Sequence, residues 1–153
     1  METQPSERGG KWVIAQSVLF LTYAFIPPFH LLFPPTAVRF AGLALLTFGA
    51  FLLLPSVPHL GRNLTPYPKP KRSGTLVTRG VYRFIRHPMY SGLFFLLGGY
   101  ALWDGHAGRL GTALVLAVFF DRKARTEERL LGEAFPRYAE YSRRTKKFIP
   151  WIY

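Results

Sequence analysis

The sequence predicts an all-α, polytopic integral membrane protein with about four transmembrane helices and a cytoplasmic C-terminal amphipathic helix. Of the 153 residues, 49% are hydrophobic and 16% aromatic, yet the formal net charge is +12. The charge is concentrated: residues 58–88 hold seven Lys or Arg and residues 121–147 hold nine, which together are 16 of the 20 in the chain. A membrane protein with its basic loops on one side combines these properties. The length corresponds to one domain, residues 1–153.

The first two apolar runs, residues 12–33 and 37–57, are expected to span the membrane. The first has 22 residues and no Asp, Glu, Lys or Arg, which is long enough to cross about 30 Å of hydrocarbon. Pro27 and Pro28 interrupt it near its end. The second run carries small residues that permit close approach of a neighbouring helix. These are Ala41, Gly42, Gly49 and Ala50.

Residues 89–120 are predicted to form a helical hairpin with a turn at residues 104–108. The apolar run Met89–Trp103 has 15 residues, which is about 22 Å of helix and short for a full crossing. It either borrows residues 81–85 as an interfacial extension or forms half of a shallow hairpin. The return helix leads directly into the charged segment.

The charged segment, residues 121–147, is predicted to be one amphipathic helix because its apolar residues recur at helical spacing. These are Leu130, Leu131, Ala134, Phe135, Tyr138 and Tyr141. Because basic loops stay on the cytoplasmic side, both termini are expected there. The simple architecture suggests a prokaryotic plasma membrane.

The polar segment 74–90 contains the candidate chemistry between the second and third apolar runs. Pro88 suits the first position of a helix, because its missing N–H would be unpaired there anyway. His87 then stands at a helix N-terminus, where free N–H groups attract anions. The alternative is a basic juxtamembrane loop with aromatic anchors at the membrane interface.

A second cluster, Glu127 and Glu128, follows Arg125 in the charged segment. Successive helical positions are about 100° apart, so one of the two carboxylates is expected to face a pocket while the other is structural. The alternative is a solvated helix face.

Several site classes are excluded or disfavoured. The absence of Cys excludes disulfides, thiolate metal sites and Cys nucleophiles. The histidines lack metal-ligand spacing, so no metal is expected. The positive-inside bias accounts for the basic charge, and no nucleic-acid motif is present, so no nucleic-acid partner is expected.

Together these motifs resemble a known family. The resemblance rests on residues 75–78, 80–82 and 86–90, then Glu127-Glu128, then an aromatic tail ending in Phe148-Ile149-Pro150. This pattern, over about residues 60–150, is similar to the isoprenylcysteine carboxyl methyltransferases and the related phospholipid methyltransferases. Those are integral membrane enzymes that use S-adenosyl-L-methionine.

The resemblance implies a set of site residues. The cofactor contacts would be Gly74, Thr75, Leu76, Val77, Tyr82, His87, Pro88, Met89, Tyr90 and Glu128. The substrate-orienting residue would be Arg125, so that Arg125 and Glu128 form the catalytic pair. The eukaryotic members have more membrane helices than this chain can supply, which leaves the prenylated-protein substrate open.

The residue types suit the implied chemistry. Glu128 can hold the cofactor's ammonium group or ribose hydroxyls, while His87 and helix N-terminal N–H groups suit its carboxylate. Tyr82 and Tyr90 can pack against the adenine or near the sulfonium cation.

The expected acceptor is amphipathic or lipid-like and enters from the bilayer. A carboxylate acceptor needs no general base, and Arg125 would orient it. A phospholipid amine or a small thiol needs a proton acceptor, for which Glu127 or Glu128 is available. A function of a different class also remains open, in which the protein is a non-catalytic adaptor whose basic face binds anionic lipid.

Overall fold

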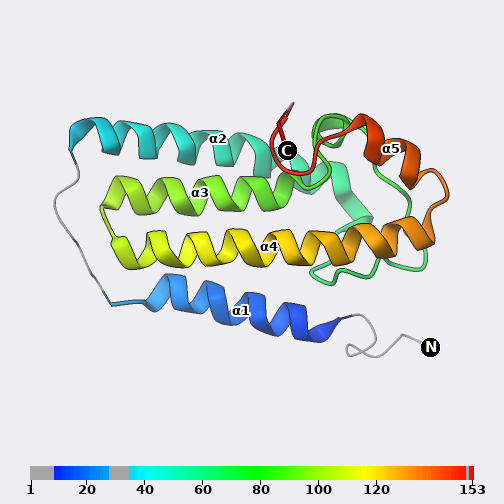
Figure 1. Cartoon of the computed structure of the whole chain (residues 1–153), viewed down its shortest axis with the longest axis horizontal. Helices are drawn as coiled ribbons and strands as arrows, with labels where there is room; N and C mark the ends of the chain where they lie inside the picture. Colours follow the sequence, from blue (N-terminus) through cyan, green and yellow to red (C-terminus); the bar gives the residue numbers. More distant parts are fainter. Residues whose placement is uncertain (1–8, 28–34, 151) are drawn as a thin grey trace.

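The computed structural model describes residues 9–27, 35–150 and 152–153. Four long helices lie side by side (Figure 1). A short fifth helix and the linker between the second and third helices, residues 61–87, lie together at one end of the bundle. The helices are α1 (Gly10–Phe25), α2 (Thr36–Leu60), α3 (Pro88–Asp104), α4 (Ala107–Ala134) and α5 (Tyr138–Arg144), with 3₁₀ turns η1 (Gly61–Asn63) and η2 (Gly80–Arg83). The described ranges contain no β-strand apart from one isolated parallel bridge, so the all-α class is confirmed.

The helices α2 and α3 pack with their backbones almost in contact. A Cβ atom added to Gly49 would lie 2.4 Å from the Leu96 nitrogen and 2.7 Å from the Gly92 carbonyl oxygen. One added to Gly42 would lie 2.7 Å from the Gly99 carbonyl oxygen. The expectation that small residues of the second apolar run admit a neighbouring helix is therefore confirmed. This packing also brings the two ends of the linker, residues 61–87, to the same end of the bundle.

The outer faces of the helices carry large apolar side chains, as a bilayer-embedded surface requires. The exposed ones on α1, α2 and α4 are Ile14, Val18, Leu21, Phe25, Phe40, Leu43, Phe48, Phe51, Leu54, Val57, Leu114, Val115 and Val118. Within the described residues, one helical segment, Thr36–Asn63, has the length and apolar composition of a membrane span.

The other three predicted crossings stay predictions. The helix α1 ends at Phe25, just before Pro27, and residues 28–33 of the predicted first span lie outside the described residues. Its 16 residues rise about 24 Å, and the 17 residues of α3 rise about 26 Å. Both are shorter than a bilayer core of about 30 Å.

The prediction of one helix over residues 121–147 is wrong. The helix α4 runs unbroken from Ala107 to Ala134, where the chain turns before α5. Phe135 is extended, with φ −128° and ψ 107°, because a residue that precedes proline is disfavoured in the α conformation. The break at Pro136 lets α5 fold back beside the linker instead of continuing outward (Figure 1).

The second predicted helix is longer than expected. It continues through Pro58 to Leu60, three residues beyond the predicted end at Val57. The ring of His59 hydrogen-bonds the Pro55 carbonyl at 2.5 Å in this last turn.

The segment after α5 pairs with the residues just before α3. The Arg86 amide donates to the Lys146 carbonyl at 2.8 Å, and the His87 amide donates to the Lys147 carbonyl at 3.1 Å. The Ser91 hydroxyl donates to the Phe148 carbonyl at 2.7 Å. These bonds fix the backbone at the start of α3, where the candidate site lies.

Candidate functional site

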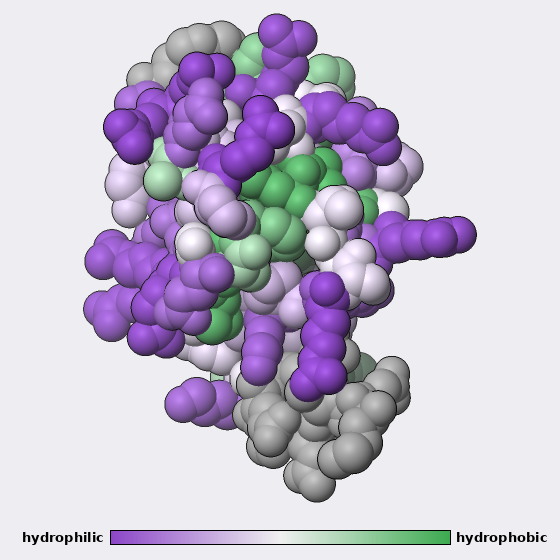
Figure 2. Space-filling model, turned by 90° about the vertical axis from the view of Figure 1, so that its right-hand side faces the viewer, coloured by the Kyte–Doolittle hydropathy of each residue, from purple (hydrophilic) through white to green (hydrophobic). Residues whose placement is uncertain are grey.

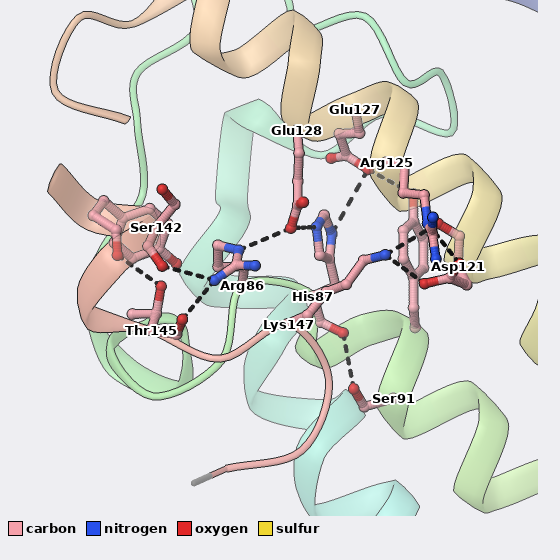
Figure 3. Close-up of polar contacts among 12 residues, drawn as sticks. Arg86, His87, Ser91, Asp121, Arg125, Glu127, Glu128, Ser142, Thr145 and Lys147 are labelled. Atoms are coloured by element: carbon pink, nitrogen blue, oxygen red, sulfur yellow. Dashed lines mark hydrogen bonds and ion pairs between the residues drawn. The ribbon is translucent and has the colours of Figure 1, made fainter. Parts of the chain in front are cut away.

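His87 lies where the helix α3 begins, with Pro88 at the first helical position as predicted. Its side chain is buried, and its ring stacks on Tyr90 at 5.4 Å with an interplanar angle of 4°. Its Nε2 atom is 3.1 Å from Glu128 Oε1, and its Nδ1 atom is 3.9 Å from Glu127 Oε2 (Figure 3). Residues 40 and 41 positions apart in sequence therefore meet at this ring.

Glu128 lies between two basic side chains. It accepts a 2.8 Å hydrogen bond from Arg86 Nε in addition to its contact with His87. The Arg86 guanidinium also donates to the carbonyls of Ser142 and Thr145. Burial disfavours the charged carboxylate, but the hydrogen bonds from His87 and Arg86 outweigh it and lower the pKa of Glu128 to about 2.

Glu127 has different surroundings although it is the next residue. It accepts a 2.8 Å hydrogen bond from the Tyr90 hydroxyl. It also lines a cavity of about 90 Å³ that is enclosed by the linker, α4 and α5, which we call the linker cavity. One of the two carboxylates lines this cavity, as helical geometry predicts, and it is Glu127.

The linker cavity brings together residues that the sequence analysis assigned to one site. The predicted residues in its lining are Gly74, Thr75, Leu76, Val77, Tyr82 and His87. Further residues in its lining are Asn63, Thr65, Tyr67, Arg86, Glu127, Leu131, Phe135, Tyr138 and Tyr141. A wider hollow of about 460 Å³ adjoins it and shares Leu76, Phe135 and Tyr141. Figure 2 shows this end of the molecule, where an apolar patch is surrounded by hydrophilic side chains.

The linker is held in place by its own polar contacts. The Thr75 amide donates to the Asn63 side-chain oxygen at 2.9 Å, and the Lys71 ammonium donates to the Arg62 carbonyl at 2.7 Å. A Cβ atom on Gly74 would lie 2.9 Å from the Lys71 carbonyl oxygen, so this turn requires glycine. Asn63 is a site-forming residue that the sequence analysis did not find, because its role depends on a backbone amide 12 residues away.

A model of the phospholipid methyltransferase family matches residues 37–138. The chain belongs to this family. It is 42% identical over 81 residues to the cobalt-zinc-cadmium resistance protein CzcN of Cupriavidus metallidurans, covering 52% of this chain and 38% of that protein. It is 32% identical over 115 residues to protein-S-isoprenylcysteine O-methyltransferase B of Arabidopsis thaliana, covering 72% of this chain and 58% of that protein.

The alignment with a third relative covers most of both chains. The probable protein-S-isoprenylcysteine O-methyltransferase of Oryza sativa is 31% identical over 147 residues, which is 90% of this chain and 77% of that protein. The resemblance to isoprenylcysteine carboxyl methyltransferases is thereby confirmed. The chain spans less than two thirds of the length of the first two relatives.

Five residues assigned through the family resemblance lie outside the lining of the linker cavity. One is Glu128, which instead contacts Arg86 and His87. Pro88, Met89 and Tyr90 form the first turn of α3 beside His87. Arg125 is absent from the lining, and its Nε atom donates to Asp121 Oδ2 at 2.8 Å (Figure 3).

Arg125 instead lines a groove of about 440 Å³ between α3, α4 and the C-terminal segment, which we call the α3–α4 groove. Its lining is Ser91, Phe94, Phe95, Ala117, Val118, Phe120, Asp121, Arg122, Arg125, Phe148, Ile149 and Tyr153. Phe120 stacks on Tyr90 at 4.8 Å, and Tyr90 stacks on His87. The stacked rings of Phe120, Tyr90 and His87 therefore lie between the α3–α4 groove and the linker cavity.

Lys123 is a buried residue that the sequence analysis did not single out, since it is one of nine basic residues in a charged segment. Its ammonium group donates to Gln16 of α1 at 2.5 Å and to the Pro66 carbonyl at 2.8 Å. Burial lowers the pKa of Lys123 to about 8, although nearby Glu127 acts in the opposite direction. Lys123 thus joins α4 to both α1 and the linker.

Proposed function

We propose that the chain is an integral membrane methyltransferase that uses S-adenosyl-L-methionine and acts on an amphipathic or lipid-like acceptor. The observation that carries the proposal is the linker cavity, because six of the ten residues assigned to cofactor binding line it together. Membership of a methyltransferase family supports the reaction class. The apolar outer faces of α1, α2 and α4 support a site at the membrane surface, which we assign to the cytoplasmic side.

The donor set of the linker cavity fits this cofactor. Glu127 offers a carboxylate to an ammonium or sulfonium cation, and Tyr82 and Tyr141 offer aromatic surface to adenine. Gly74, which the turn after Lys71 requires, is part of the lining. The cofactor supplies an electrophilic methyl group when bound. The protein's part is to position the reactants and exclude water.

The ionisation of Glu128 bears on the class of acceptor. A carboxylate whose pKa is about 2 stays charged but is a weak base at neutral pH. Its contacts with Arg86 and His87 suit a positioning role for these two side chains. A carboxylate acceptor requires no proton acceptor, whereas a phospholipid amine or a thiol would need Glu127, the carboxylate that lines the cavity.

The α3–α4 groove suits the lipid-like part of such an acceptor. Its walls include Phe94, Phe95 and Val118, and the last of these is exposed on the outer face of α4. Arg122 and Arg125 line the same groove and can attract an anionic headgroup. We propose that the acceptor enters here from the bilayer with Arg125 orienting its carboxylate, and that the carboxylate must pass the ring stack of His87, Tyr90 and Phe120 to reach the cofactor.

The first test is binding of S-adenosylhomocysteine to the detergent-solubilised protein by calorimetry. The wild type should bind, and Glu127→Gln and Glu128→Ala should weaken binding at least tenfold. Glu133→Ala is the matched control, because Glu133 is exposed on the same helix and absent from the cavity lining. A folded wild type that does not bind would overturn the proposal and favour the lipid-binding adaptor.

The second test compares acceptors in a methyl-transfer assay. Prenylcysteine analogues, phospholipid amines and small thiols are each offered to the same preparation. Transfer to the carboxylate of a prenylcysteine analogue is expected. Transfer confined to an amine or a thiol would contradict the carboxylate assignment and leave the methyltransferase proposal standing.

A further inference from the structure

The hydroxyl of Tyr138 is buried without a hydrogen-bond partner among the residues that the structure describes. Tyr138 is the first residue of α5, and 6% of its surface is exposed. A buried phenol normally finds a partner, because water can no longer satisfy its hydroxyl and an unmade hydrogen bond is costly. This hydroxyl therefore needs an explanation other than fold stability.

The ring of Tyr138 lies near Tyr141 and near Gly132 of α4. It meets the ring of Tyr141 edge to face at a centroid distance of 6.0 Å, and Gly132 of α4 lies close to its Cδ1 edge. Both tyrosines line the linker cavity. The hydroxyl is the part of Tyr138 that makes no hydrogen bond with the described residues.

The hydroxyl of Tyr141, which lines the same cavity, has a structural role. It donates a 2.7 Å hydrogen bond to the Tyr82 carbonyl and thereby ties α5 to η2. Tyr138 and Tyr141 sit on one helix, have the same chemistry and line the same cavity, but only Tyr141 has a partner within the described chain. The partner of the Tyr138 hydroxyl therefore lies outside the described chain.

Burial raises the pKa of the Tyr138 hydroxyl, and the nearby Glu128 carboxylate acts in the same direction, while Arg86 opposes it. The phenol is therefore protonated at neutral pH and is able to donate a hydrogen bond. An oxygen or nitrogen acceptor on a ligand would satisfy it.

We propose that Tyr138 is a further cofactor-binding residue, whose hydroxyl donates a hydrogen bond to a polar acceptor of S-adenosylmethionine or S-adenosylhomocysteine in the linker cavity. The inference rests on the proposed function, since it requires that cofactor. It extends the binding site from the linker and α4 to α5. The break at Pro136 makes this contact possible, because it lets α5 fold back over the cavity.

The test compares Tyr138→Phe with Tyr141→Phe in two measurements on the full-length protein in detergent. The first is thermal unfolding of the cofactor-free protein, and the second is the affinity for S-adenosylhomocysteine by calorimetry. Tyr138→Phe should leave the melting temperature of the free protein unchanged or raise it, because no hydrogen bond is lost. It should weaken S-adenosylhomocysteine binding about fivefold to tenfold, the usual effect of one hydrogen bond.

Tyr141→Phe should behave differently, because it loses its bond to the Tyr82 carbonyl. Its free protein should melt at a lower temperature than the wild type. Wild-type affinity in Tyr138→Phe, or a drop in its melting temperature like that of Tyr141→Phe, would overturn the inference while the proposed function stands. A folded wild type that does not bind S-adenosylhomocysteine would overturn both.

Discussion

Adjacent glutamates on α4 have separate surroundings at the residue scale. Glu128 is enclosed by Arg86 and His87, whereas Glu127 bonds Tyr90 and lines the linker cavity. Helical spacing predicts that the two residues differ, and the family resemblance assigns the cofactor contact to Glu128. Which of them contacts the cofactor stays a prediction, since helical spacing separates two neighbours but does not say what each one meets.

The depressed pKa of Glu128 makes the stability of the protein depend on pH. Its folded-state pKa of about 2 lies below the ordinary value of 4.5, so its contribution is complete above about pH 4.5 and is lost as the pH falls towards 2. The shift corresponds to on the order of 3 kcal/mol. Glu128→Gln should therefore lower the melting temperature markedly at pH 7 and progressively less below pH 4.5.

Thermal unfolding between pH 3 and pH 7 checks this expectation, with Glu133→Gln as the exposed control. If the difference in melting temperature between wild type and Glu128→Gln stays constant across this range, the carboxylate is not held in its charged form.

At the scale of elements, the glycine contacts between α2 and α3 hold both ends of the linker in place. Gly49→Ala would put a methyl group 2.4 Å from the Leu96 backbone nitrogen, so the helices must separate. We expect a loss of about 1–3 kcal/mol in unfolding free energy. Affinity for S-adenosylhomocysteine should fall with it, because the linker ends would move apart.

The control for this change is Gly98→Ala on α3. No atom lies within 4 Å of a Cβ at that position among the described residues, and alanine favours a helix over glycine. It should be neutral or slightly stabilising in the same detergent unfolding assay. Equal effects of the two substitutions would contradict the role assigned to the α2–α3 contact.

At the scale of the whole molecule, the charge asymmetry predicts the orientation. The linker and the segment that follows residue 121 hold most of the basic residues and lie at the same end of the bundle (Figure 1). Thr36, the first residue of α2, lies at the opposite end. The linker end should therefore be cytoplasmic.

The absence of native Cys makes a direct topology test possible. A membrane-impermeant maleimide applied to intact cells should label Thr36→Cys and should label Arg137→Cys only after permeabilisation, since both positions are exposed. Labelling of Arg137→Cys in intact cells, with Thr36→Cys protected, would invert the assigned orientation.

The sequence by itself determined the class of the fold and six of the residues that line the linker cavity. Apolar runs of helical length predicted α1 to α4, Pro88 marked the start of α3, and the motif in residues 74–90 named six residues that line one cavity. These features are local, since they depend on composition, spacing and the backbone restrictions of proline.

Only the tertiary structure decided which side chains meet. The break before Pro136 brings Tyr138 to the cavity, and the pairing of residues 84–87 with residues 146–147 holds His87 beside Glu128. Arg125 faces the α3–α4 groove instead of the linker cavity. Such outcomes depend on contacts between segments far apart in the chain, and helical periodicity specifies a face of each helix but not its partner.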